Sequence, residues 1–382
     1  MRRRVVILGM GDTGLLTAVR LRRVADLTVV APRGGMVSGQ ELGLRLAQPD
    51  TWLSTSLFPA DRYPALAGAQ VLHGRATAVD ADAQTVTVRL AGGRTTVQPY
   101  DVLVIATGTT SGFWRSGRIE DLATVEARVR QHAALLQAAR SVAVVGGGAS
   151  GVSVAYNLKR RRPDQAVHLV HRGAALLPAY PAPTREALTQ DLQAAGVQLH
   201  LGRSVRTPDR PPTGPTPGPV VFSDGDALPV DAAVWTTGAA QPNTDFLPPA
   251  WLDAEGFVRV TDTLLVEGET DVFAVGDVAA TDPQRSSARN AGHAVVAANV
   301  RARLRGRAPP RRLRPPPPRR WGSVLGLQPE GMTVYLPKGQ RLRFGPWLSR
   351  TFLFQLVVRR LLFRGIRSFA LIPPEPGGVR RG

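Results

Sequence analysis

Two stretches of the sequence repeat one pattern, and this pattern limits the folds that the chain can adopt. Each begins with an apolar, β-branched run, passes through a turn with the spacing G-x-G-x-x-G and continues with helical periodicity. The first is VVILGMGDTG at residues 5–14, and the second is VAVVGGGASG at residues 142–151. A strand, a glycine turn and a helix in this order form a Rossmann-like dinucleotide-binding unit. The repeat therefore predicts an α/β fold with two such domains.

The three glycines of each motif have different tasks. The first permits a tight turn, the second lets the backbone approach a pyrophosphate, and the third lets the helix pack on the strand. The helix N-terminus adds free N–H groups and a positive dipole end. A single copy is also compatible with an ordinary turn, but two copies in the same context favour nucleotide binding. The motif glycines are Gly9, Gly11 and Gly14 in the first copy and Gly146, Gly148 and Gly151 in the second.

Matching segments follow both copies. A hairpin and a buried strand lead to Thr107–Gly108 after the first, and the same order leads to Thr237–Gly238 after the second. A later strand, TDVFAVGDVAA, ends at Gly276–Asp277. A carboxylate there can accept hydrogen bonds from a ribitol chain beside the next helix, although Asp277 can also act as a helix N-cap.

The composition excludes several kinds of chemistry. The 382 residues include no cysteine, which rules out disulfide frameworks, thiolate-ligated iron–sulfur clusters and thiol redox catalysis. The six histidines show no metal or triad spacing, so we predict no metal site and no catalytic side chain. The basic start at Met1–Arg4 leads into a strand and not into a signal peptide, which favours a cytoplasmic location.

Positive charge is concentrated at the C-terminal end. Residues 301–382 carry a net charge of +17, of the +19 of the whole chain. They include a proline- and arginine-rich linker, two expected strands around WGSVLGL and MTVYLP, and an apolar, arginine-studded segment at 347–367. This segment is too short to span a bilayer, which needs about 20 apolar residues. It suits an interfacial helix on an anionic membrane, or else a helix or strand packed on the protein with its arginines in solvent. Nucleic acid is disfavoured because no recognition module is present.

The order of GMGDTG, YDVLVIATG, VGGGASG, VWTTGAAQPNT and TDVFAVGDVAA resembles that of flavoproteins with two dinucleotide-binding domains, the pyridine nucleotide-disulfide oxidoreductase superfamily. The resemblance covers residues 5–304. It implies an FAD-binding domain at 1–112 and 239–308, an NAD(P)H-binding domain at 113–238 and a C-terminal α+β domain at 309–382. It implies FAD at Gly9, Gly11, Gly14, Thr107, Gly108, Gly276 and Asp277, and NAD(P)H at Gly146, Gly148, Gly151 and Gly238.

Without redox cysteines, the resemblance narrows to type II NADH:quinone oxidoreductases, apoptosis-inducing-factor-like quinone reductases and ferredoxin-reductase-like enzymes. The C-terminal sequence is most similar to the first two. The resemblance implies hydride transfer from NAD(P)H to flavin N5 and then electron transfer to an acceptor, with a quinone as the first choice. An acidic ferredoxin-like protein and a redox sensor with little turnover are the alternatives. The chain has Arg289, Asn290 and Ala291 where type II enzymes carry glutamines, and Ser153 where they carry a glutamate.

Both second strands end without the acid that usually binds an adenosine ribose. The first ends at Ala31–Pro32, so we expect Arg33 and nearby backbone to hold the ribose of FAD, and Arg45 to cover the pyrophosphate. Asp12 lies inside the phosphate-binding turn and is expected to point outward. The second copy ends at His171–Arg172, where Arg172, alone or together with His171, favours NADPH over NADH unless it is only a surface residue. The oligomeric state does not follow from the sequence.

Overall fold

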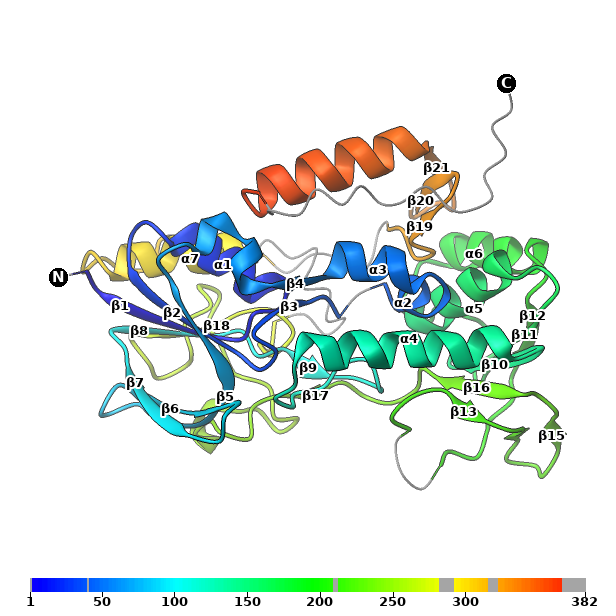
Figure 1. The fold of residues 1–382 in the computed structure, drawn as a ribbon, viewed down its shortest axis with the longest axis horizontal. Coiled ribbons are helices and arrows are strands. Elements are labelled where there is room, and N and C mark those ends of the chain that lie inside the picture. Colours follow the sequence, from blue (N-terminus) through cyan, green and yellow to red (C-terminus); the bar gives the residue numbers. More distant parts are fainter. Residues whose placement is uncertain (1, 40, 209–211, 282–291, 315–321, 366–382) are drawn as a thin grey trace.

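Two parallel sheets, one built from each glycine motif, form the frame of the chain (Figure 1). The computed structural model describes residues 2–39, 41–208, 212–281, 292–314 and 322–365. Each motif lies between a central strand and a helix, as its pattern predicts. The predicted α/β class with two Rossmann-like domains is therefore confirmed.

The first sheet has seven strands in the order β18-β8-β1-β2-β5-β6-β7. Strands β18 to β5 run parallel, and β6 and β7 continue the sheet as an antiparallel meander. Because β2 and β8 lie on opposite sides of β1, a crevice forms at the carboxyl end of β1. The strands are β1 (Arg4–Leu8), β2 (Asp26–Ala31), β5 (Gln70–Asp80), β6 (Thr85–Leu90), β7 (Thr95–Pro99), β8 (Val102–Ile105) and β18 (Val272–Ala274).

The central strands of this sheet are covered on both faces. Every residue of β8 is at most 1% exposed, as expected for an interior parallel strand. Helix α1 (Asp12–Leu21) follows β1 and packs against α7 (Gly292–Arg303). The sequence predicts helix from 286 to 304, and its first part, including Arg289, Asn290 and Ala291, lies outside the described residues.

The second sheet has the order β12-β11-β10-β16-β13, with β13 as its antiparallel edge. Here β11 and β16 lie on opposite sides of β10, so the second motif is also placed at a crevice. The strands are β10 (Ser141–Val145), β11 (Ala166–His171), β12 (Gln198–Leu201), β13 (Thr216–Pro217) and β16 (Ala232–Trp235). The helices of this part are α4 (Leu122–Ala138), α5 (Ala149–Arg161) and α6 (Ala182–Ala194).

Two chain crossings connect the sheets, and they pair with each other. The chain leaves the first sheet through β9 (Thr109–Thr110) and returns through β17 (Gln241–Pro242), and these two strands form an antiparallel pair. The first sheet thus contains strands from both sides of the second in sequence. The boundaries at residues 112, 238 and 308 stay predictions.

The C-terminal part is a small antiparallel sheet followed by a helix. Its elements are β19 (Leu327–Gln328), β20 (Gly331–Tyr335), β21 (Arg341–Phe344) and η4 (Trp347–Leu362). The strand expected at MTVYLP is β20. Of the described residues of WGSVLGL, 322–327, only Leu327 belongs to a named strand, and β21 is not predicted from the sequence. The sheet packs on the second domain, where the Asn157 side chain donates to Leu325 O at 2.8 Å.

Helix η4 extends along one side of the molecule, from β21 toward the first domain (Figure 1). Just beyond its end, the ring of Phe363 lies 6.0 Å from that of Tyr63, between ring centroids. Within the described ranges, no helix combines the length and the apolar character needed to cross a membrane.

The remaining elements are short and lie along the chain between the strands named above. They are β3 (Gly35–Val37), β4 (Leu57–Pro59), β14 (Val220–Val221), β15 (Ala227–Leu228), α2 (Leu42–Ala47), α3 (Pro49–Ser56), η1 (Ala60–Arg62), η2 (Pro64–Leu66) and η3 (Pro249–Trp251).

Candidate functional site

The first glycine turn is shaped by close contacts at two of its three motif positions. Gly9 has a φ of +106°, and a Cβ there would lie 2.3 Å from Ala106 O. A Cβ at Gly14 would lie 2.1 Å from Gly9 O. In contrast, a Cβ at Gly11, the N-cap of α1, would meet no atom of the described chain within 4 Å. The fold itself requires the first and third glycines, while the second faces the approach to the helix N-terminus.

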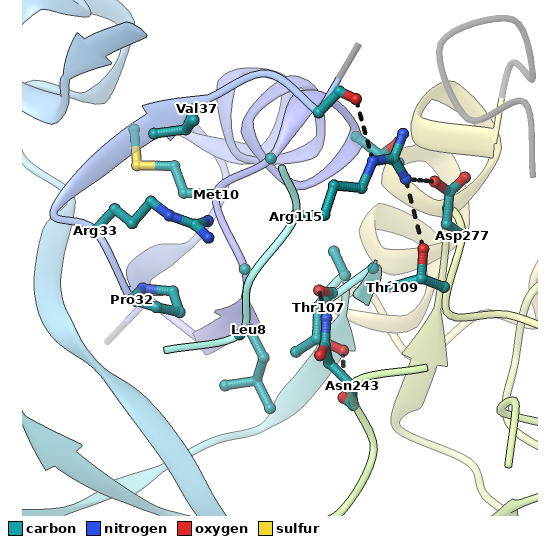
Figure 2. Close-up of a pocket in the computed structure, with 18 of the residues that line it drawn as sticks. Leu8, Met10, Pro32, Arg33, Val37, Thr107, Thr109, Arg115, Asn243 and Asp277 are labelled. Carbon is teal, nitrogen blue, oxygen red and sulfur yellow. Dashed lines mark hydrogen bonds and ion pairs between the residues drawn. The ribbon is translucent and has the colours of Figure 1, made fainter. Parts of the chain in front are cut away.

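A cavity lies in front of this turn at the carboxyl edge of the first sheet (Figure 2). Its empty volume is about 1140 Å³, part of which is open to solvent. Most of the predicted FAD residues line it, although they come from separate parts of the chain. Those lining the cavity are Gly9, Gly11, Arg33, Thr107, Gly108, Gly276 and Asp277. Gly14 lies behind the turn, against Gly9.

Asp277 faces Arg115 across one end of the cavity (Figure 2). The Asp277 side chain is 6% exposed, and its Oδ2 lies 2.8 Å from Arg115 Nη1. Arg115 also donates to Gly39 O at 3.1 Å and to Thr109 Oγ1 at 3.5 Å. Arg115 is not predicted from the sequence, because its loop has no periodicity or motif that marks it.

A second residue that the sequence reasoning missed, Asn243, ties the turn after β8 to the returning chain. Thr107 Oγ1 donates to Asn243 O at 2.9 Å, and Asn243 Nδ2 donates to Thr107 O at 3.1 Å. The backbone N–H of Asn243 also donates to Gly108 O at 3.1 Å. The sequence does contain a pattern that marks Asn243, since this residue belongs to VWTTGAAQPNT, one of the segments on which the family resemblance rests.

The opposite end of the cavity is formed where β2 ends. Pro32 and Arg33 line it, together with Arg75 from β5. Arg33 Nε lies 3.4 Å from Glu120 Oε1, and Arg33 also donates to Ser116 O. Burial lowers the pKa of Arg33, and the nearby Glu120 opposes this shift. A buried acid is therefore present near the end of β2, but it comes from a distant segment and is paired with arginine.

Arg45 lies outside the cavity. It is 3% exposed, donates to Trp114 O at 2.8 Å, and its guanidinium lies 4.7 Å from the ring centroid of Trp52. Burial is the main cause that lowers its pKa to about 10, followed by repulsion from Arg33 and Arg128. Its placement gives no support to the prediction that it covers a pyrophosphate.

Asp12 does not point outward as expected, because it lines the cavity. Its Oδ2 lies 3.3 Å from Ser38 Oγ, which follows β3. Burial raises the pKa of the Asp12 carboxyl, while the Ser38 hydrogen bond and the positive charge of Arg115 act in the opposite direction. We expected Asp12 to point outward because a carboxylate repels a phosphate. The structure instead places this carboxylate at the cavity.

The second glycine turn repeats the geometry of the first. Gly146 has a φ of +122°, and a Cβ at Gly151 would lie 1.8 Å from Gly146 O. A Cβ at Gly148, the N-cap of α5, would meet no described atom within 4 Å. Thr236 Oγ1 donates to Val145 O at 2.9 Å and so joins the ends of β10 and β16 beside the turn. Gly238, with a φ of +111°, follows at the same edge.

The end of β11 carries His171 and Arg172 beside this turn. His171 Nδ1 accepts a hydrogen bond from the Gly147 N–H at 3.2 Å. Burial lowers the pKa of His171, and the adjacent Arg172 lowers it further. His171 therefore acts as a neutral support for the turn, whereas the exposed Arg172 side chain faces solvent.

Both turns fit the diphosphate of a dinucleotide. Neither α1 nor α5 has a side-chain hydrogen bond at its N-cap, so the first N–H groups of each helix are left for another acceptor. A positive dipole end and a glycine without a side chain stand at the same point. FAD suits the first turn with its cavity, and NAD(P)H suits the second.

Comparisons with known proteins agree with this arrangement. The profile of the pyridine nucleotide-disulphide oxidoreductase family matches residues 3–299. Type II NADH:quinone oxidoreductase Ndh of Mycobacterium tuberculosis is 31% identical over 356 residues, which cover 81% of this chain and 75% of that protein. Oxidoreductase ptaL of Pestalotiopsis fici is 27% identical over 328 residues, which cover 80% of this chain and 84% of that protein.

A solved structure shows the same fold. The covalent putidaredoxin reductase–putidaredoxin complex aligns with a TM-score of 0.62 at 22% identity. The alignment covers 88% of this chain and 87% of that one. The shared architecture thus extends over nearly the whole length of both chains.

Proposed function

This chain belongs to the pyridine nucleotide-disulphide oxidoreductase family, and on that premise we propose that it is an FAD-dependent NAD(P)H oxidoreductase with a quinone as electron acceptor. The observation that carries the proposal is the cavity at the first sheet. It gathers the glycine turn, Thr107–Gly108 and Gly276–Asp277 from three distant segments around one space. Because the chain has no cysteine, a disulfide cannot be the electron carrier.

The protein's part in this reaction is positioning. Bound FAD supplies the hydride acceptor, and bound NAD(P)H supplies the hydride. We assign the diphosphate of FAD to Gly9 and Gly11 at the N-terminus of α1, and the ribitol to Asp277. Gly146 and Gly148 hold the second nucleotide at the N-terminus of α5. These residues fix two flexible cofactors in one orientation, which removes an entropic part of the barrier.

A quinone is favoured as the acceptor by the 31% identity with type II NADH:quinone oxidoreductase. A small acidic protein is the second candidate, since a neighbour of the same fold was solved with putidaredoxin. The exposed side chains of η4 favour a quinone over an acidic protein as the acceptor. Six of the nine exposed large hydrophobic side chains in the described part of the chain belong to this helix, and Trp347 and Leu361 are 68% and 63% exposed.

We further propose that η4 docks on an anionic membrane surface, where a lipid-soluble quinone is found. Burial of its exposed apolar side chains in the acyl boundary supplies the main stabilisation. Arg360, near the end of this helix, and Arg364, just beyond it, are also exposed. Basic side chains near an anionic surface contribute about 1 kcal/mol each. This arrangement corresponds to a peripheral association and not to a membrane span.

We also propose that Arg172 gives a preference for NADPH. It is exposed at the end of β11, where a carboxylate would select the 2′-OH of NADH. His171 is held by Gly147 and supports the turn, which leaves Arg172 as the cation available to a 2′-phosphate.

The test begins with an absorption spectrum of the purified full-length chain, which should show flavin peaks released as FAD on denaturation. Oxidation of NADPH and NADH should then be followed with a soluble quinone and, separately, with an acidic one-electron carrier protein. Turnover with the quinone supports the proposal. Turnover with the carrier protein but not with the quinone would show that the acceptor is a protein. Purified protein that neither contains nor binds FAD would overturn the function.

A further inference from the structure

Asp12 is an acid in a position where a negative charge opposes the expected ligand. It is the first residue of α1 and lies between Gly11 and Gly14 in the turn assigned to the diphosphate. It lines the cavity, and its Oδ2 is 3.3 Å from Ser38 Oγ. An acid in the first turn of a helix is favourable toward the helix dipole. However, it competes with a phosphate for the same N-terminal positive charge.

The charged groups that face Asp12 from the neighbouring elements offset its negative charge only in part. The nearest are Arg115, from the loop after β9, and Asp277, from the end of β18. Arg115 is ion-paired with Asp277 at 2.8 Å and also contacts Gly39 O and Thr109. Together, Asp12, Arg115 and Asp277 leave a net negative charge at this end of the cavity when both acids are ionised.

The other arginines that line the cavity are also paired with acids. Arg33 is paired with Glu120, and Arg75 is paired with Asp245. Every arginine among the described lining residues therefore has a carboxylate partner. A diphosphate with two negative charges must then lie beside a carboxylate, with a helix end of roughly half a positive charge as compensation.

Protonation of Asp12 removes this conflict. A neutral carboxyl group donates one hydrogen bond, to a phosphate oxygen or to Ser38 Oγ, where a carboxylate can only accept. Burial already favours the neutral form, since it raises the pKa of the carboxyl before any phosphate is present. A nearby dianion shifts the equilibrium further in the same direction.

We propose that FAD is held by this chain with Asp12 as a neutral carboxylic acid, so that FAD binding to the protein with an ionised Asp12 takes up one proton. This inference rests on the proposed FAD site. The proton comes from solvent, is attached to a carboxyl oxygen of Asp12, and returns to solvent when FAD leaves. Asp12 thereby makes the retention of FAD depend on pH.

The direction in which FAD affinity changes with pH follows from the coupling of FAD binding to the protonation of Asp12. The bound form has the higher Asp12 pKa, so FAD affinity is full below the pKa of the FAD-free protein. It declines as the pH rises above that value, by about tenfold per unit, and becomes constant above the pKa of the bound form. An Asn at this position keeps the shape and hydrogen bonding but has no proton to lose.

The experiment measures FAD release from the full-length holoenzyme. The protein is diluted into buffers from pH 6 to 9, and the recovery of free-flavin fluorescence gives the release rate. We expect the wild-type rate to rise at least tenfold over this range and the rate of Asp12→Asn to change less than twofold. Ser38→Ala removes a hydrogen bond that favours the carboxylate, so its profile should shift to higher pH. A purely structural role of Ser38 would change the rate without shifting the profile.

Three results would overturn the inference. They are a wild-type release rate independent of pH, a rate that falls as pH rises, and an Asp12→Asn variant that keeps the wild-type pH dependence. A circular dichroism melt of each variant identifies loss of the fold. These outcomes leave the proposed function intact, since the holoenzyme would still contain FAD. Only purified protein without flavin refutes both.

Discussion

The substitution Gly11→Ala separates the nucleotide-binding role of the first turn from its structural role. Gly11 has φ −74° and ψ −174°, which alanine adopts without strain. Its added methyl group would meet no described atom within 4 Å. Loss of glycine at an N-cap costs about 0.5–1.5 kcal/mol, and the stiffer unfolded chain returns about 0.4–1 kcal/mol. The free energy of unfolding should therefore change by less than about 1 kcal/mol.

The effect on FAD should be larger. The methyl group stands where a diphosphate approaches the N–H groups of α1. Loss of one hydrogen bond to a charged group costs about 1.5–3 kcal/mol, which corresponds to roughly a ten- to hundredfold increase in the Kd of FAD. The assay is quenching of flavin fluorescence during reconstitution. Thermal melts should compare flavin-free proteins, because bound FAD itself raises the Tm.

Two matched variants complete this experiment. Gly148→Ala has the same geometry in the second turn, with φ −78° and ψ −178°, and should raise the KM for NADPH while FAD binding stays at the wild-type level. Gly14→Ala places a Cβ 2.1 Å from Gly9 O, and overpacking of about 1–3 kcal/mol should lower the Tm by roughly 1–4 °C. If Gly11→Ala retains wild-type FAD affinity, the diphosphate does not bind at this turn.

Three further predictions concern side chains at the edges of the two sites. Arg33→Ala should weaken FAD binding about tenfold, since it removes a cavity-lining cation while Glu120 keeps its partner Arg128; full flavin content after purification would contradict the adenosine assignment. Arg172→Ala should lower kcat/KM about tenfold for NADPH and less than twofold for NADH, and steady-state kinetics that show equal losses would remove the preference. A double variant, Trp347→Ala with Leu361→Ala, should reduce flotation with anionic vesicles by at least tenfold, because each buried side chain contributes about 1.5–3 kcal/mol; wild-type protein that does not float would refute docking.

The parts of the site that the sequence predicts are those set by the backbone. Gly9 and Gly146 stand out because a positive φ and a close contact leave no alternative to glycine. Thr107–Gly108 and Gly276–Asp277 could be placed because they end apolar strands, and the carboxyl ends of parallel strands meet at one edge of a sheet. Local pattern and sheet topology were sufficient for these residues.

The parts that the sequence does not predict depend on which loops meet. Arg115 reaches Asp277 across 162 positions of sequence, and no local pattern records such a contact. Arg45 has the right charge and a plausible position along the chain, but its helix turns it toward Trp52. The orientation of Asp12 depends on Ser38, which arrives from another strand. Side-chain direction in loops is a tertiary property, so charge and spacing alone are poor guides to it.

The order of strands in the first sheet has a consequence for how the chain folds during synthesis. β18 pairs with β8, yet the whole second sheet is translated between them. At synthesis rates of about 5–20 residues per second, the edge of β8 is exposed for roughly ten to thirty seconds. Exposed strand edges are templates for aggregation. Gly276 and Asp277 emerge just after β18, so the cavity that we assign to FAD is completed only when the ribosome has passed them. We therefore expect FAD loading to be a late step in the maturation of this protein.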